Sequence, residues 1–150
     1  MPNSGEWRSR LSLPENFYAH PIFVHFPQGL FPVAFASFLL YLATGSPDFE
    51  TGAFVAAGFG AAAAPVTTLT GFIDWKVRYK GTMTPVFRIK IIGAFVLIAL
   101  SIPAVLLRLS SPHATVLPLS GTGWIYAALL AGSAGTCVVL GHYGGKLVFH

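Results

Sequence analysis

Histidine is the residue type in this sequence best suited to binding chemistry, and its placement is uneven. His20 and His25 stand before or at the start of the first apolar segment, whereas His142 and His150 lie at the end of the fourth. Polar side chains at membrane depth are costly, so they are the first place to look for a function. Two imidazoles at one depth on different helices, beside a glycine-rich face, could ligate a haem b from both sides.

The depth of these imidazoles follows from a helical rise of about 1.5 Å per residue. His142 lies roughly 10 Å inside a helix that ends near Phe149, and His25 lies roughly 7 Å inside a helix that begins near His20. We therefore predict that His25 and His142 bind haem iron as a pair. His20 and His150 form a second, shallower candidate pair. The cations that could meet the haem propionates are Lys146, Arg78 and Lys90.

The prolines around His25 leave a second interpretation open. Pro21, Pro27 and Pro32 crowd this stretch, and proline favours the first turn of a helix. A first helix that begins only at Phe26 or Pro27 would leave AHPIFVH extended along the membrane interface. His25 would then be a capping or interfacial residue.

Two opposite charges flank the loop between the second and third apolar segments. Asp74 ends the second segment and Lys90 opens the third. The two side chains could form an ion pair that closes this end of a helix bundle. Alternatively, Asp74 could relay protons or contact a quinone near the lipid headgroups. The opposite side of the membrane offers only His113, in a loop, so we expect function on the histidine-rich side.

Other chemistries find no support in the residues. The sequence contains no glycine-rich phosphate loop outside an apolar segment, and neither HExxH nor GxSxG occurs. Hydrolysis by paired carboxylates is not expected, because the chain has five acidic residues. Its single cysteine, Cys137, excludes a thiolate zinc site. Whether the chain is an enzyme stays open.

The composition identifies lipid as the solvent of this chain. Hydrophobic residues make up 54% and charged residues 9%, where a soluble domain carries about 25% charged residues. A chain so poor in charge could not cover a water-exposed surface. The nine Lys and Arg cluster beside apolar segments, which favours topology control or lipid headgroup contact over a nucleic-acid partner.

Four apolar segments approach or reach the roughly 20 residues that cross the hydrocarbon. They run from Phe26 to Thr44, Gly52 to Trp75, Ile89 to Leu109 and Trp124 to Phe149. The sequence therefore predicts an all-α, integral membrane four-helix bundle, with residues 1–150 as a single transmembrane domain.

The cations predict the orientation of these spans. Eight of the nine fall on one side of a four-span chain, and Arg108 alone falls on the other, with Asp48 and Glu50. The positive-inside rule places both termini and the second loop in the cytoplasm, and we expect the bacterial inner membrane as the location.

Small residues predict how the second span packs. Ala56, Gly60 and Ala64 recur at every fourth position, so they form a face without side-chain bulk. Such a face lets a neighbouring helix or a flat cofactor approach closely.

Three segments in order, HPIFVHFPQGL, TGFIDW and GHYGGKLVFH, resemble a bacterial family of four-helix membrane proteins. The family is catalogued only as a domain of unknown function (number twenty-two thirty-one), and the resemblance runs from about His20 to His150. In that family the domain occurs alone or joined to Rieske iron–sulfur or c-type cytochrome modules, which implies by association a role in membrane electron transfer. The positions that match the family's motif histidines and its glycine pair are His20, His25, His150, Gly144 and Gly145.

The chain departs from that family pattern at two places. Many members carry a histidine at the start of the third helix, where this chain has Lys90. Members also continue past the final histidine with glycine and a short tail, whereas this chain stops at His150. If the histidine of the third helix is a ligand in the relatives, one ligand is missing here.

Two functional hypotheses follow. The first is a cytochrome b-like subunit that binds haem b and exchanges electrons with a quinone or a protein partner. The second is a non-catalytic accessory subunit that packs against a larger respiratory or photosynthetic complex in the lipid bilayer. The two are compatible, because a haem-carrying subunit of a complex would satisfy both.

Overall fold

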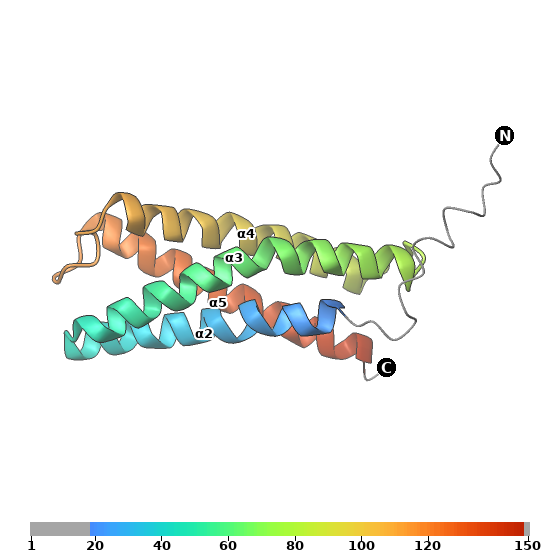
Figure 1. The fold of residues 1–150 in the computed structure, drawn as a ribbon, viewed down its shortest axis with the longest axis horizontal. Helices are drawn as coiled ribbons and strands as arrows, with labels where there is room; N and C mark the ends of the chain where they lie inside the picture. The colour runs from blue at the N-terminus through green and yellow to red at the C-terminus, as the bar shows by residue number, and fades with distance from the viewer. Residues whose placement is uncertain (1–18, 149–150) are drawn as a thin grey trace.

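A computed structural model describes residues 19–148, and these residues form four helices (Figure 1). In chain order they are α2 (Ala19–Thr44), α3 (Pro47–Val77), α4 (Pro85–Ser110) and α5 (Gly121–Val148). All four are long and apolar enough to cross a membrane. The predicted all-α, four-helix architecture is confirmed.

Short turns with defined backbone chemistry separate α2, α3 and α4. Gly45 follows α2 with a φ of 70°, and its amide donates to the Tyr41 carbonyl, so the helix ends on a left-handed residue. Both following helices begin with proline, whose fixed φ and missing N–H suit the first turn. At the start of α4 the Thr84 hydroxyl accepts from the Phe87 amide.

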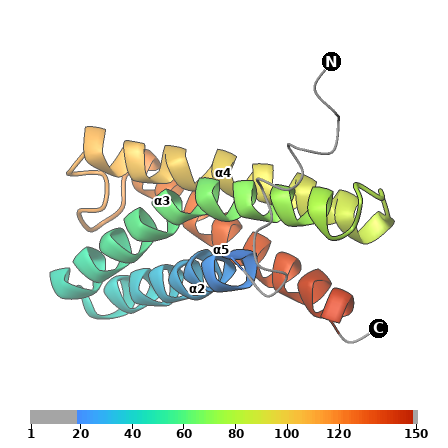
Figure 2. The same cartoon turned by 45° about the vertical axis from the view of Figure 1, so that its right-hand side comes forward.

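The helices surround two clusters of buried apolar residues. Neighbours in the sequence pack against each other, and α2 also packs against α5. In both views α3 lies beside α2 at one end of the bundle and beside α4 at the other (Figures 1 and 2). We call the end that holds the start of α2, residues 78–84 and the end of α5 the histidine end. The opposite end, with residues 45–46 and 111–120, is the arginine end.

The first helix begins at Ala19, so His20 and His25 both lie inside α2. The alternative of an extended AHPIFVH stretch is wrong. Pro21 stands in the first turn, where its missing N–H leaves no hydrogen bond unmade. Pro27 lies deeper and cannot donate to the Phe23 carbonyl, and the Thr67 hydroxyl of α3 donates to that carbonyl instead, at 3.1 Å.

The small-residue face of α3 is a helix-packing face. Ala56 and Ala64 are buried, and a Cβ on Gly60 would stand 3.0 Å from the ring of Phe31. Phe31 is itself fully buried on α2. This face therefore receives an aromatic side chain of the neighbouring helix, which is one of the two outcomes that its sequence allows.

The helix lengths place the ends of the bundle near the lipid headgroups. α2 has 26 residues, which is about 39 Å at the helical rise, against about 30 Å of hydrocarbon. Large apolar side chains point outward along the helices, among them Phe59 on α3 and Phe95 on α4, which are 67% and 62% exposed. Lipid covers such side chains in a membrane protein.

The topology is testable by cysteine labelling. We expect Met83→Cys to react only after the membrane is permeabilised and His113→Cys to react in intact cells, because the positive-inside rule places residues 78–84 in the cytoplasm. Both sites are exposed, and the buried Cys137 is replaced by Ser beforehand. Reaction of both cysteines from the same side would contradict the four-span arrangement. Reaction of Met83→Cys in intact cells, with His113→Cys reacting only after permeabilisation, would contradict the predicted orientation.

Candidate functional sites at the two ends of the bundle

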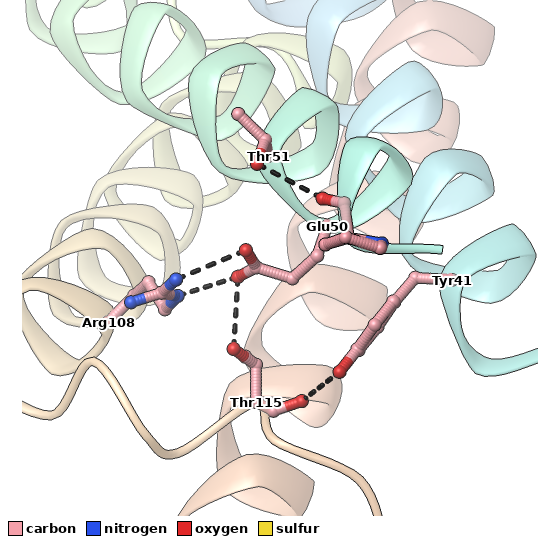
Figure 3. A network of polar contacts seen from close by, with 6 residues as sticks. Tyr41, Glu50, Thr51, Arg108 and Thr115 are labelled. Carbon is pink, nitrogen blue, oxygen red and sulfur yellow. Dashed lines mark hydrogen bonds and ion pairs between the residues drawn. The ribbon is translucent and has the colours of Figure 1, made fainter. Parts of the chain in front are cut away.

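A buried ion pair joins α3 to α4 at the arginine end (Figure 3). The guanidinium of Arg108 donates from Nε to Oε1 of Glu50 at 2.6 Å and from its terminal nitrogen to Oε2 at 3.1 Å. Both side chains are largely buried, with 19% and 10% of their surface exposed. Two parallel charge-assisted bonds make this a geometrically specific contact.

The loop between α4 and α5 closes over this pair. The hydroxyl of Thr115 donates to Oε1 of Glu50 at 3.0 Å, and its backbone carbonyl accepts from the Tyr41 hydroxyl at 2.6 Å (Figure 3). Thr115 and Tyr41 are both buried. The network therefore connects α2, α3, α4 and the loop in one unit.

The position of each charge suits its helix end. Glu50 lies in the first turn of α3 and Arg108 in the last turn of α4. Negative charge is favoured at the amino end of a helix and positive charge at the carboxyl end. Because the two helices are antiparallel neighbours, these two favoured positions meet at the same level.

The sequence places Arg108, Asp48 and Glu50 on this side of the membrane but does not predict that Glu50 and Arg108 form a pair. The predicted second span began at Gly52, whereas α3 begins at Pro47 and includes Glu50. The missed signal was present in the sequence: Arg108 was the single cation on its side of the membrane, opposite a carboxylate. A cation that departs from the positive-inside pattern indicates a structural partner.

The histidine end gathers polar groups from three helices. His20 of α2 is half-buried, with Nδ1 3.2 Å from the Thr67 carbonyl and 3.5 Å from the Thr70 hydroxyl. It interacts electrostatically with Asp74 of α3 and Lys90 of α4. We call these three side chains the His20–Asp74–Lys90 cluster.

Asp74 forms an ion pair within the described residues, but its partner is not Lys90, the residue that the sequence suggests. The Arg78 guanidinium, one turn further along α3, lies 3.9 Å from the Asp74 carboxylate. Lys90 is half-buried and interacts with Asp74 at longer range. The cluster is therefore a set of coupled charges in which Lys90 has no direct ion pair with Asp74.

Gly71 makes room for the imidazole of His20. A Cβ on Gly71 would stand 2.8 Å from Cε1 and 3.0 Å from Nδ1 of that ring. Contacts this short do not occur, so a side chain at this position would displace the histidine. The glycine of the TGFIDW motif has a specific packing partner.

His25 and His142 both lie on the outer surface of the bundle. Both side chains are exposed. His25 follows the inward-facing His20 by five positions, and His142 follows the buried Cys137 by five. Five residues turn a helix by about 140°, so both imidazoles point away from the packed interior. His25 bonds through Nδ1 to the Pro21 carbonyl, and the His142 ring meets Tyr143 edge to face at 5.3 Å.

The remaining predicted cofactor residues divide into two groups. Gly144 and Gly145 are half-buried in the last turns of α5, and a Cβ on either would meet nothing within 4 Å. His150 lies outside the described residues. Among residues 19–148, no group of three or more His, Cys, Asp or Glu side chains could hold a metal ion.

Comparison with known proteins identifies the chain at the level of its family. The model of a family described as "Predicted membrane protein (DUF2231)" matches residues 17–150. The chain belongs to this family. No curated protein and no solved structure matches the chain. The DUF2231 match covers both polar ends of the bundle, so the Glu50–Arg108 pair and the His20–Asp74–Lys90 cluster both lie within the family domain.

Removing one partner of the buried ion pair of this DUF2231 protein should be strongly destabilising. We expect Arg108→Met to lower the free energy of unfolding in mild detergent by about 3–5 kcal/mol, because it leaves the Glu50 carboxylate buried without its cation. Arg88→Met on the exposed side of the same helix is the control and should change it by less than about 0.5 kcal/mol. Equal effects of the two substitutions would contradict the role of the pair.

The fit of His20 against Gly71 gives a second stability test. Gly71→Ala should lower the free energy of unfolding by about 1–3 kcal/mol, because the added methyl overlaps the imidazole. Gly52→Ala, on the same helix with open space around it, should instead stabilise the helix by up to about 1 kcal/mol. Combining Gly71→Ala with His20→Ala should recover most of the loss, and no recovery would show that the contact is not the cause.

Proposed function

We propose that this chain is a small electron-transfer subunit of the bacterial inner membrane that binds haem b on the outer surface of α2 and α5. His25 and His142 are the residues that would hold the haem iron. The observation that carries the proposal is the hydrogen bond between His25 Nδ1 and the Pro21 carbonyl.

That hydrogen bond determines which nitrogen of His25 is available. A carbonyl oxygen only accepts, so Nδ1 carries the proton and the neutral ring keeps a free lone pair on Nε2. Histidines that bind metals through one nitrogen almost always donate the other N–H to a carboxylate or a backbone carbonyl. In this tautomer, Nε2 of the exposed His25 ring is available to bind a metal, which supports the proposal.

The two proposed ligands lie at the same end of the bundle. His25 follows the first residue of α2 by six positions, and His142 precedes the last residue of α5 by six. Six residues correspond to about 9 Å of helix, and both of these helix ends belong to the histidine end. An imidazole directed into lipid at this depth is unfavourable unless a cofactor or a partner covers it.

The surface beside His142 suits a flat macrocycle. Gly144 and Gly145 leave open space on α5, which permits close approach of a planar group to the helix. Lys146 lies over the Tyr143 ring at 5.0 Å and supplies a cation for a propionate. When bound, haem b supplies a one-electron change of its iron, and the chain would hold and orient it in the membrane.

The His20–Asp74–Lys90 cluster supports a quinone-linked role at the same end. Its three side chains combine an imidazole, a carboxylate and an ammonium group at the level of the headgroups. Such groups can donate hydrogen bonds to a quinone oxygen and exchange protons with it. We propose Asp74 and Lys90 as the contacts, with His20 as the group that couples them to α2.

The same outward histidines support a second candidate, a non-catalytic subunit of a larger membrane complex. Imidazoles on an exterior that is otherwise apolar can be covered by a protein partner instead of a cofactor. Gly58 of α3 and Gly135 of α5, with open space around them, offer places where a further helix could approach.

One purification tests both candidates. We expect the chain, purified from its native membrane in mild detergent, to show a reduced-minus-oxidised spectrum of a b-type haem, with a haem content measured as the pyridine haemochrome. His25→Ala and His142→Ala should each reduce the haem content to background, because each removes an iron ligand. His113→Ala, at the arginine end, is the matched control and should retain haem.

Two different results would contradict the haem-binding role and the ligand assignment separately. A chain that is folded and free of haem in its native membrane would rule out the haem-binding role, and partner proteins in fixed ratio would then support the accessory role. Haem that survives both His25→Ala and His142→Ala would leave haem binding intact and contradict this ligand assignment.

A further inference from the structure

The hydroxyl of Tyr126 is a buried polar group for which residues 19–148 supply no hydrogen-bond partner. Tyr126 of α5 is fully buried, and its Oη has no hydrogen bond in the described part of the chain. Its ring meets Phe38 edge to face at 5.3 Å, which fixes the side chain in the core. Buried polar groups are nearly always hydrogen-bonded to protein or to ordered water, so this hydroxyl requires an explanation.

Tyr126 lies in the same part of the bundle as the Glu50–Arg108 pair. It interacts electrostatically with both members of the pair. It also belongs to the same buried cluster as Ala53, three residues after Glu50 on α3, and Ala104, four residues before Arg108 on α4. The ring therefore shares a buried cluster with the helix faces of α3 and α4 that carry the ion pair.

The ion pair keeps hydrogen-bonding capacity that the protein does not use. The Glu50 carboxylate offers about four acceptor positions and receives three bonds, two at Oε1 and one at Oε2. The guanidinium of Arg108 has about five N–H donors, of which two are engaged with Glu50. One acceptor on Oε2 and further donors on Arg108 thus remain in the same region as the Tyr126 hydroxyl.

We propose that an internal water molecule binds between the Tyr126 hydroxyl and the Glu50–Arg108 pair. Such a water would accept from Tyr126 or Arg108 and donate to Oε2 of Glu50, giving it the two to four polar partners that a buried water requires. It would extend the network at the arginine end to α5, so that all four helices and the loop share one set of hydrogen bonds.

A second buried hydroxyl, that of Ser101, lies too far from Arg108 to share this water. Its hydroxyl is also buried without a partner, but it precedes Arg108 by seven residues, or about 10 Å of helix. One water cannot reach both places. The proposal therefore concerns Tyr126 alone.

An experimental structure of the protein in detergent or nanodiscs, at a resolution that shows ordered water, tests the proposal directly. We expect density within hydrogen-bonding distance of both Tyr126 Oη and the Glu50 carboxylate, and we expect Tyr126→Phe to remove it. Absence of that density in a map that resolves other bound waters would overturn the proposal.

The stability of Tyr126→Phe gives an independent readout. A water-bridged hydroxyl predicts a lower unfolding temperature for this variant, because the water and Glu50 lose a partner. A hydroxyl that is buried without any partner predicts an equal or higher unfolding temperature, and this result would contradict the bound water. Tyr41→Phe, which removes the bond to the Thr115 carbonyl, is the matched control and should lower the unfolding temperature in either case.

Discussion

Lipid offers no hydrogen bonds, and this constraint governs the whole structure. Backbone and side-chain polar groups within the spans therefore bond mainly to one another inside the protein. The Thr67 hydroxyl donates to the Phe23 carbonyl that Pro27 cannot reach, and Glu50 and Arg108 satisfy each other across two helices. Several other hydroxyls bond to the preceding turn of their own helix, as Thr136 does, and among the described residues the buried hydroxyls of Ser101 and Tyr126 have no protein partner. The apolar exterior and the paired interior are two consequences of the same solvent.

The two ends of the bundle use polar residues differently. At the arginine end the ion pair, Thr115 and Tyr41 are buried and bonded to one another, so this end joins three helices and a loop. At the histidine end the polar groups are half-buried or exposed, and His25 and His142 point away from the core. A buried hydrogen-bonded network and outward-facing histidines suit different tasks: the first holds the helices together, and the second leaves imidazoles accessible from outside the bundle.

Placement on the helix surface decides how a histidine can act. His20 packs against Gly71 and bonds to the backbone of α3, so its ring helps hold α2 to α3 and is tied to Asp74 and Lys90 through charge. His25, five residues later, is turned to the outside, and its bond to Pro21 leaves Nε2 free. Two histidines of one motif therefore have separate roles, one between helices and one at the surface.

The sequence by itself determined the membrane class, the four helices and the gathering of histidines near one end, because these follow from hydropathy and chain order. It also predicted the packing face at Ala56, Gly60 and Ala64. It did not determine where the first helix begins, since prolines allow either start. Only the tertiary structure decided that Glu50 meets Arg108, 58 positions later, and that His25 faces outward while His20 faces α3. Such pairings depend on the level and rotation of helices packed against each other, which no local pattern encodes.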